Sequence, residues 1–281
     1  MIRTIAATRA ACERARAEGR TVGFVPTMGA FHEGHRSLLR RARGERDLVV
    51  VSIFVNPLQF GDPADLEAYP RDERADLEMA RGDGVDLVFA PSADEMYPNG
   101  EPEFTVDPGP LGERLEGASR PGHFRGVATV VAKLFDTVGP CTAYFGEKDA
   151  QQLAVIRGMV RDLSLPVDVR VCPVVREPDG LALSSRNRLL SPDEREAATC
   201  LFLALSEAAE LARAGERETG RLVAAMAREI GATPLAHIDY VAVVDEQTFE
   251  EVRTIAGPAR ALVAARFGRV RLIDTLLLPT A

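Results

Sequence analysis

The chain has 281 residues, of which 46% are apolar, and a formal net charge of −8 at pH 7. This length and apolar content suffice for a buried core and for two domains. The negative charge argues against a surface that binds nucleic acid. No apolar run approaches the ~20 residues that a membrane-spanning helix needs.

The N-terminal stretch, residues 1–19, has the pattern of an amphipathic helix and lacks the apolar core of a signal peptide. The chain has four widely spaced cysteines and no C-x-x-C pair. We therefore expect a cytoplasmic protein whose cysteines are reduced and mostly buried.

The first half of the sequence alternates β-rich apolar runs with helical patterns. Strands are predicted at 21–26, 47–55, 85–91, 142–146 and 166–175. Helices are predicted from about Gly34 onward and over 74–84, 124–139 and 149–163. Such alternation predicts an α/β fold with a doubly wound parallel sheet, a Rossmann-like domain covering residues 1–174.

The pattern changes near residue 175. A helix is predicted over 191–215, with Ser191 as its N-cap and Pro192 as its first residue, and a second over 217–231. Three strand-like runs follow at 237–245, 259–267 and 270–278. Helices followed by strands predict a smaller α+β domain over residues 175–281.

Four polar segments follow the predicted strands of the first half. They are PTMGAFHEGH (26–35), NPLQFG (56–61), GEKDAQQ (146–152) and REPDGLALSSRN (176–187). Ligands of open parallel sheets bind beyond the carboxyl ends of the strands. We therefore expect these segments to form one active site.

His32 and His35 lie where the first strand gives way to a helix. Gly29 and Gly34 would allow a ligand close to the backbone, and a helix N-terminus favours a phosphate group. The histidines could then donate hydrogen bonds to phosphate oxygens, more strongly if protonated. H-x-x-H is also compatible with a metal site, although zinc usually needs a third protein ligand, and with two purely structural histidines.

Two later segments add candidate phosphate ligands. Lys148 would supply a point charge and Asp149 could accept hydrogen bonds from ribose hydroxyls. LSSRN (183–187) offers two hydroxyl groups and a guanidinium. Taken alone, the first segment is at least as compatible with a solvated helix cap, and the default interpretation of the second is an N-cap with a surface arginine.

Six segments in order resemble one family: PTMGAFHEGH, FVNPLQFG, YPR, RPGHFRGVATVVAKL, FGEKDAQQL and REPDGLALSSRN. They resemble the pantothenate synthetase (pantoate–β-alanine ligase) family of the nucleotidylyltransferase superfamily with its H-x-G-H motif. The resemblance implies that the carboxylate of (R)-pantoate attacks the α-phosphate of ATP, giving pantoyl adenylate and pyrophosphate. The amine of β-alanine then displaces AMP to give pantothenate. The resemblance also implies a homodimer and Mg²⁺ bound mainly through the ATP phosphates.

Carried over by position, the resemblance assigns the site residues. To ATP it assigns Met28, Gly29, Ala30, Phe31, His32, Glu33, Gly34, His35, Gly146, Glu147, Lys148, Asp149, Val175, Leu183, Ser184, Ser185 and Arg186. Among these, catalytic roles fall to His32, His35, Lys148, Ser184, Ser185 and Arg186. To pantoate or β-alanine it assigns Gln59, Gln152, Asn56 and Arg125. Asp76 is a weak candidate for a metal ligand, because the family often has adjoining acids where this chain has Ala75-Asp76.

Two other functions remain open from the sequence. The chain could be another H-x-G-H nucleotidylyltransferase acting on a small metabolite, or a non-catalytic nucleotide-binding protein. Gln59 and Gln152 favour a small polyhydroxy acid over a second nucleotide. Whether His35 transfers a proton or only stabilises charge is left open, as is the extent of any domain closure.

Overall fold

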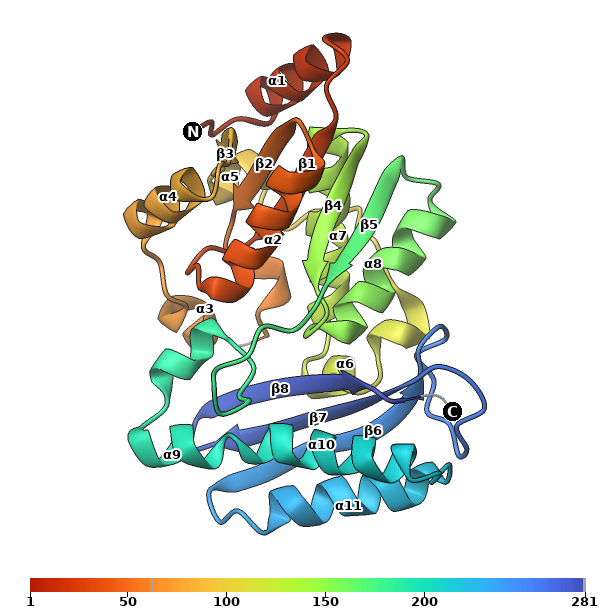
Figure 1. The fold of residues 1–281 in the computed structure, drawn as a ribbon. Helices are drawn as coiled ribbons and strands as arrows, with labels where there is room; N and C mark the ends of the chain where they lie inside the picture. Colours follow the sequence, from red (N-terminus) through yellow and green to blue (C-terminus); the bar gives the residue numbers. More distant parts are fainter. Residues whose placement is uncertain (62, 280–281) are drawn as a thin grey trace. The chain divides into compact units, whose positions relative to one another are not determined.

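A computed structural model describes residues 1–61 and 63–279, and they form two compact units. The first unit comprises Met1–Gly146 and Val155–Pro173, and the second comprises Glu147–Ala154 and Val174–Ala281 (Figure 1). The sequence predicts one domain boundary, between residues 174 and 175. In the structure, the segment Glu147–Ala154 groups with the second unit as well.

The first unit contains a five-stranded, fully parallel sheet in the order β3-β2-β1-β4-β5. The strands are β1 Val22–Thr27, β2 Leu48–Ile53, β3 Leu87–Phe89, β4 Cys141–Gly146 and β5 Val167–Cys172. Central strands such as β2 are buried almost throughout, because helices cover both faces of a parallel sheet. The predicted α/β fold is confirmed.

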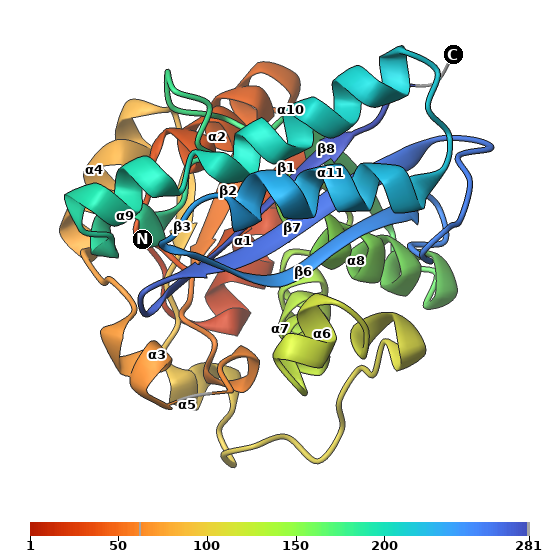
Figure 2. The same cartoon turned by 90° about the horizontal axis from the view of Figure 1, so that it is seen from below.

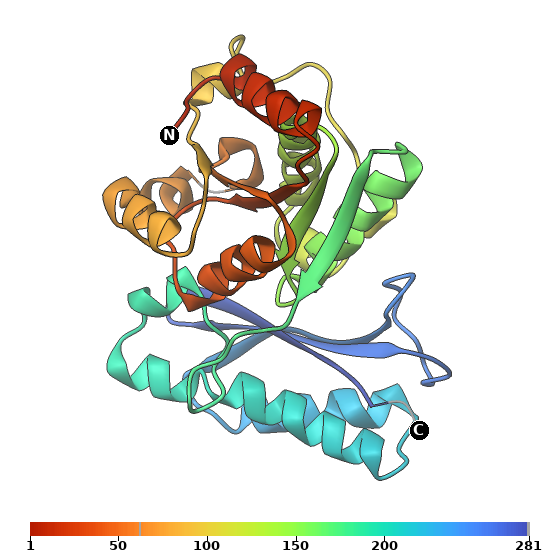
Figure 3. The same ribbon diagram turned by 45° about the horizontal axis from the view of Figure 1, so that its top comes forward.

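Helices lie on both faces of this sheet (Figure 3). The longer ones are α1 Ile5–Ala17, α2 Glu33–Glu45, α4 Glu73–Gly82, α7 His123–Val138 and α8 Ala150–Asp162, whose first residues, up to Ala154, group with the second unit. Helix α2 packs on β1, β2 and β4 and also contacts α4, whereas α1 and α7 pack together on the other face. Short elements complete the unit: η1 Pro57–Gln59, α3 Pro63–Ala68, α5 Ala93–Met96, η2 Gly109–Gly112 and α6 Glu116–Ser119.

Strands β1 and β4 are neighbours at the point where the strand order reverses. From β1 the chain proceeds to β2 on one side, and from β4 it proceeds to β5 on the other. The carboxyl ends of β1 and β4 therefore flank a topological switch point, the position at which open α/β sheets bind ligands. The segment containing His32 and His35 begins at this edge.

The second unit has a three-stranded antiparallel sheet, β6 Ala236–Asp245, β7 Ala259–Phe267 and β8 Val270–Leu277, in that order. Helices α10 Cys200–Arg213 and α11 Thr219–Gly231 lie side by side against it (Figure 2). Two shorter helices, η3 Ser185–Leu189 and α9 Pro192–Ala197, precede them. The predicted α+β character of this part is confirmed.

The single helix predicted over 191–215 is wrong, because α9 and α10 are separate. Ser191 and Pro192 begin α9 as expected, through a capping box. At the junction, the N–H of Thr199 donates to the carbonyl of Glu196 at 3.2 Å, three residues back, and its hydroxyl donates to the same oxygen at 2.8 Å. A threonine hydroxyl that competes for a helix carbonyl interrupts the regular bonding pattern.

All four cysteines are free, as the sequence predicts. Burial raises the pKa of the Cys141 thiol to about 12, so this thiol is unreactive at neutral pH. Among the described helices, none is both long and apolar enough to cross a membrane.

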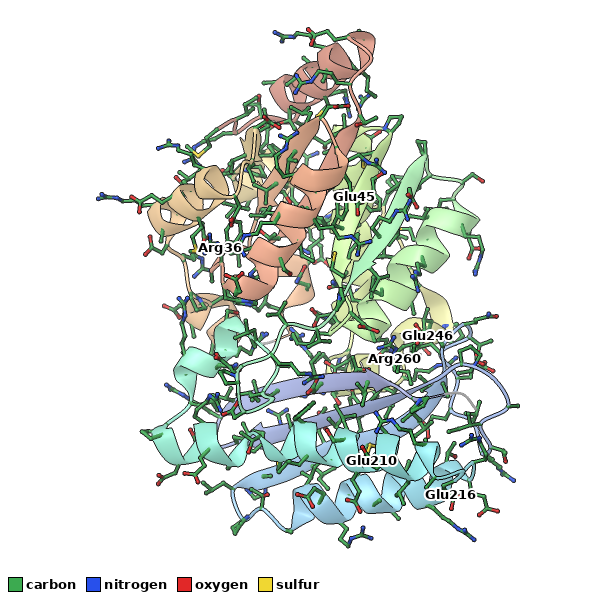
Figure 4. All side chains as sticks on the ribbon, in the orientation of Figure 1. Arg36, Glu45, Glu210, Glu216, Glu246 and Arg260 are labelled. Atoms are coloured by element: carbon green, nitrogen blue, oxygen red, sulfur yellow. The ribbon has the colours of Figure 1, made fainter. Side chains whose placement is uncertain are left out.

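Helix α2 is held against α4 by one buried carboxylate. The side chain of Asp83, at the end of α4, is only 3% exposed and accepts from Arg36 at 2.7 Å and Arg40 at 2.9 Å. Burial acts to raise the pKa of Asp83, but the hydrogen bonds from the two guanidinium groups outweigh it and hold the pKa below its usual value. These bonds fix α2, whose first turn carries the histidine motif (Figure 4, Arg36).

Replacing Asp83 by Asn should therefore make the free energy of unfolding depend less on pH in the acid range. A carboxylate with a depressed folded pKa stabilises above its unfolded pKa of about 3.9, and this contribution is lost as pH falls through the folded pKa. We expect Asp83→Asn to lower the free energy of unfolding by on the order of 1 kcal/mol at pH 7. In urea titrations, the difference in the free energy of unfolding between wild type and Asp83→Asn should shrink as the pH falls toward 2.

Asp162→Asn serves as the control, because Asp162 pairs with Arg161 on an exposed surface. It should change stability little at any pH. If the difference in the free energy of unfolding between wild type and Asp83→Asn does not vary with pH, the Asp83 carboxylate does not stabilise the fold in the way described.

Candidate active site

The loop after β1 has an unusual backbone conformation, which a carboxylate of helix α4 holds in place. Gly29 has φ +83 and Ala30 has φ +54, both in the left-handed region. The buried carboxylate of Asp76 accepts from the N–H of Ala30 at 2.8 Å and from that of Phe31 at 2.7 Å. A Cβ at position 29 would lie 2.7 Å from an Asp76 oxygen, so the tight loop requires glycine there.

This arrangement bears on the metal question. Both oxygens of Asp76 accept hydrogen bonds from the loop backbone. In the part of the chain that the structure describes, no group of three or more His, Cys, Asp or Glu side chains could hold a metal ion. The observed role of Asp76 is therefore to shape the loop, and the geometry lends no support to its prediction as a metal ligand.

The two histidines cap the start of α2. His32 is the N-cap residue, one position before the helix begins at Glu33, and its Nδ1 accepts from the N–H of Gly34 at 3.1 Å. The Nδ1 of His35 accepts from the N–H of His32 at 3.4 Å, completing a reciprocal capping box. The two rings are 4.2 Å apart between centroids, so the structure brings the predicted pair together.

These capping bonds fix the tautomer of both histidines. A backbone N–H can only donate, so each Nδ1 must be unprotonated and each neutral ring carries its proton on Nε2. Both rings are therefore hydrogen-bond donors through Nε2. A second proton, on Nδ1, would remove a capping bond, so the sequence-based expectation that protonation would help has a structural cost.

A buried amide cluster lies after β2. Asn56 caps η1 and is 1% exposed. Its Oδ1 accepts from the N–H of Leu58 at 3.3 Å and from the hydroxyl of Tyr97 at 2.8 Å. Its Nδ2 donates to the carbonyl of Gly126 and to Oε1 of Gln59, both at 3.1 Å.

Gln59 connects this cluster to the loop after β1. Its Nε2 reaches Sδ of Met28 at 3.0 Å. Its backbone carbonyl contacts Nδ1 of His123 at 2.7 Å and accepts from Arg120 at 3.2 Å. The structure thus brings together Met28, Asn56 and Gln59, three of the predicted residues.

The cation near Gln59 differs from the one that the sequence suggested. Arg125 is exposed, whereas Arg120 and His123 contact Gln59. A Cβ at Gly126 would lie 2.2 Å from the carbonyl oxygen of Leu58, so α7 packs there backbone to backbone. The helical spacing of His123 and Gly126 puts them on one face and Arg125 on another, a signal that could have identified the contacting residues.

The segment after β4 belongs to the second unit and is tied to its sheet. Arg260 of β7 is buried and pairs with Glu147 at 2.8 Å and with Glu246 at 2.6 Å (Figure 4). Burial acts to lower the pKa of Arg260, but the two carboxylates outweigh that effect and raise it. Next to this anchor, Nζ of Lys148 lies 3.6 Å from Asp149.

The remaining predicted residues lie on a short hairpin of the second unit. The N–H of Leu183 donates to the carbonyl of Val175 at 2.9 Å, which brings these two residues together. Ser184 caps η3, where its Oγ accepts from the N–H of Arg186 at 3.3 Å, and Ser185 is buried. Arg176, which pairs with the buried Asp274 at 2.6 Å, anchors the base of the hairpin.

Each unit therefore carries a defined share of the predicted site. The first unit holds residues 28–35, Asn56, Gln59 and the strand end Gly146. The second holds residues 147–149, the half-buried Gln152 in the first turn of α8, Val175 and residues 183–186. Four further residues, Tyr97, Arg120, His123 and Arg260, were not predicted from the sequence, and they support site residues through hydrogen bonds or ion pairs.

Comparisons with known proteins agree with one another. A family model described as pantoate-beta-alanine ligase matches residues 1–277. A pantothenate synthetase of Heliobacterium modesticaldum is 58% identical over 265 residues, 94% of each chain. One from Roseiflexus sp. (strain RS-1) is 56% identical over 278 residues, 99% of each chain.

Solved structures give the same result. A pantothenate synthetase from Thermus thermophilus matches with a TM-score of 0.92 at 49% identity, covering 99% of both chains. A pantoate-beta-alanine ligase from Francisella tularensis, solved in complex with beta-gamma ATP and beta-alanine, matches with a TM-score of 0.80 at 35% identity. That match covers 99% of this chain and 97% of the other.

The role of Asp76 predicts a specific effect of its removal. Asp76→Ala leaves two buried N–H groups without their acceptor, so the free energy of unfolding should fall by about 1–3 kcal/mol. Amide hydrogen exchange at Ala30 and Phe31 should accelerate, as measured by NMR or mass spectrometry.

Glu78→Ala is the matched control, because Glu78 lies on the same helix and its side chain is 64% exposed. It should leave exchange in the loop unchanged. Equal exchange at Ala30 and Phe31 in both variants would show that Asp76 does not hold the loop.

Proposed function

The chain belongs to the pantoate–β-alanine ligase family, and we propose that its residues carry out the ligation through a pantoyl-adenylate intermediate. The overall reaction joins pantoate to β-alanine with ATP and yields pantothenate, AMP and pyrophosphate. The observation that carries the proposal is the pair of histidines at the N-terminus of α2. Both rings are fixed as Nε2–H donors at the switch point of a parallel sheet.

The chemistry needs donors and positioning more than a protein nucleophile. In the first step, a carboxylate oxygen of pantoate bonds to the α-phosphorus of ATP and the bond to pyrophosphate breaks. In the second step, the amine of β-alanine bonds to the acyl carbon, AMP leaves with the carboxylate oxygen, and the amine loses a proton. The substrate supplies the nucleophile each time, so the protein contributes mainly orientation and charge stabilisation.

We propose that His35 stabilises charge and does not transfer a proton. A neutral imidazole that carries its proton on Nε2 can donate a hydrogen bond to a phosphate oxygen. To give up a proton it would first need to be doubly protonated, which would remove the bond from the N–H of His32 to Nδ1. The same reasoning applies to His32, whose Nδ1 caps Gly34.

Residues of both units are proposed to bind ATP. Met28 to His35 would line the nucleotide, with Nε2 of His32 and of His35 on phosphate oxygens. Lys148 would neutralise phosphate charge and Asp149 would accept from ribose hydroxyls. Gly146, Glu147, Val175, Leu183, Ser184, Ser185 and Arg186 complete the proposed ATP ligands. The anchoring of Glu147 by Arg260 supports a fixed position for Lys148.

Gln59 and Gln152 are proposed to bind the hydroxyl groups or carboxylate of pantoate. Gln59 is 8% exposed and contacts Met28 of the loop, which supports its placement beside the reacting carboxylate. Asn56 would act by supporting Gln59, since its own polar atoms bond within the cluster. Arg125, as an exposed side chain, is the weakest of the assigned ligands.

Mg²⁺ is proposed to be bound by the ATP phosphates, whose charge requires screening. The described residues contain no cluster of His, Cys, Asp or Glu suited to a metal. We therefore assign no protein ligand and no step to the ion. A homodimer, implied by the resemblance, and a cytoplasmic location, expected from the cysteines and the N-terminal stretch, remain predictions. We propose no nucleic-acid or membrane partner.

The alternatives from the sequence are disfavoured. A family match over residues 1–277 leaves no unmatched region for a different catalytic domain within that range. A nucleotide sensor would not need to stabilise a transition state, so the presence of His32, His35, Lys148 and Arg186 argues against that alternative.

Pyrophosphate release tests the function directly. With ATP, Mg²⁺ and pantoate but without β-alanine, the protein should release pyrophosphate up to about one equivalent per active site if the adenylate stays bound, and adding β-alanine should make release continuous. A panel of other small hydroxy acids should give much less. Folded protein that releases no pyrophosphate in response to pantoate would overturn the proposal.

Individual substitutions test the assigned roles. His35→Ala and Lys148→Ala should each lower the rate of adenylate formation by on the order of 10²-fold, because each removes a stabiliser of the transition state. His237→Ala, which alters an exposed histidine of β6, is the control and should be close to wild type. Rates near wild type for His35→Ala or Lys148→Ala would remove that residue from the mechanism.

Gln59→Ala should act on the other substrate. It should raise the KM for pantoate while leaving ATP binding, measured by calorimetry, largely intact. An equal loss of affinity for ATP would contradict the assignment of Gln59 to pantoate.

A further inference from the structure

We propose that Tyr97 is a positioning residue that acts through Asn56 on Gln59. Its hydroxyl helps to hold the Gln59 amide so that the Nε2–H group, and not the oxygen, faces the acid substrate. The inference rests on the proposed function, because it takes Gln59 to be a ligand of pantoate.

Two backbone groups determine which end of the Asn56 side-chain amide is the oxygen and which is the nitrogen. The N–H of Leu58 can only donate and the carbonyl of Gly126 can only accept. The first lies 3.3 Å from one end of the Asn56 amide and the second 3.1 Å from the other. Oδ1 must therefore face Leu58 and Nδ2 must face Gly126, which settles the amide orientation by its partners.

Tyr97 strengthens this orientation. Its hydroxyl lies 2.8 Å from Oδ1 of Asn56, which can only accept, so the tyrosine donates. This bond is shorter than the 3.3 Å contact from the N–H of Leu58 to the same oxygen. Burial raises the pKa of Tyr97, so the hydroxyl keeps its proton and remains a donor at neutral pH.

The fixed orientation of the Asn56 amide determines the orientation of the Gln59 amide. Nδ2 of Asn56 donates to the Gln59 side chain at 3.1 Å, so the atom that receives this bond must be Oε1. Nε2 then occupies the other side of the amide, 3.0 Å from Sδ of Met28. The backbone of Gln59 is held as well, since its carbonyl contacts His123 and Arg120.

The Gln59 amide, at the end of this chain of bonds, is suited to bind an anion. A thioether sulfur is a weak acceptor, so the N–H of Gln59 makes a poor bond to Met28. A carboxylate or hydroxyl oxygen of the substrate would make a better one, strongest if charged. With the amide reversed, Oε1 would face the substrate and repel a carboxylate. The cluster therefore selects an acceptor-rich acid over a donor-bearing analogue.

The experiment compares two buried tyrosines of the first unit. Tyr97→Phe removes the hydroxyl but keeps the ring, which lies 6.0 Å from Phe54 between centroids. It should raise the KM for pantoate by about 3- to 10-fold, as expected for the loss of one neutral hydrogen bond. The KM for ATP and kcat should stay within about 2-fold of wild type, since nucleotide contacts are untouched.

Tyr144→Phe is the matched control. The hydroxyl of Tyr144 donates to Glu45 at 2.9 Å, a bond to a carboxylate outside the cluster (Figure 4, Glu45). Its removal should lower thermal stability at least as much as Tyr97→Phe does, yet leave the KM for pantoate unchanged. The pair thus separates a loss of stability from a loss of substrate positioning.

A second variant reverses the polarity. In Asn56→Asp the carboxylate can only accept, so Gln59 must turn its Nε2 toward position 56 and present Oε1 to the substrate. The KM for pantoate should rise by on the order of 100-fold or more, because a buried polar group then opposes the acid. If this variant does not fold, the comparison of Tyr97→Phe with Tyr144→Phe still decides.

The outcomes separate this inference from the proposed function. A rise in the KM for pantoate alone in Tyr97→Phe supports the inference. A KM equal to that of Tyr144→Phe, or an equal rise for ATP, overturns it while the function stands. A wild-type protein without pantoate-dependent pyrophosphate release overturns the proposed function itself, and the inference with it.

Discussion

The site depends on the fact that a backbone N–H can only donate and a backbone carbonyl can only accept. Such contacts hold three groups of side chains in place and decide which ring or amide atoms of the histidines and of Asn56 are donors. Asp76 accepts from two N–H groups and fixes the loop after β1. His32 and His35 accept at Nδ1 and so carry their protons on Nε2. Asn56 lies between one N–H and one carbonyl, and it passes its orientation on to Gln59.

In the proposed mechanism, these contacts supply hydrogen-bond donors that are in place before the substrates bind. Preorganised donors stabilise developing charge without reorganisation in the transition state. The histidine donors are assigned to phosphate and the Gln59 donor to the acid, so both partners of the first step would meet matching groups. This division explains why a carboxylate can serve as nucleophile without covalent help from the protein. It also accounts for the burial of Tyr97 with its hydroxyl hydrogen-bonded to the Asn56 amide.

Much of the fold and part of the site follow from the sequence alone. Apolar runs predicted all the strands of both sheets, and strand–helix alternation predicted the parallel topology. The histidines stood out because glycines flank them where a strand gives way to a helix. Asp76 and Tyr97 gave no such signal, since their partners are backbone or amide groups 46 and 41 residues away. The break between α9 and α10 was missed because it depends on the hydroxyl of Thr199, which the spacing of apolar residues does not reveal.

The transfer of oxygen from pantoate to AMP tests the central claim most directly. If a pantoate carboxylate attacks the α-phosphorus, pantoate labelled with ¹⁸O in its carboxylate should give AMP that carries one ¹⁸O atom per turnover. Mass spectrometry of AMP from a complete reaction with ATP and β-alanine measures this. Label in AMP at one atom per pantothenate formed is the predicted result. AMP without label, from a reaction that still forms pantothenate, would contradict the adenylate mechanism.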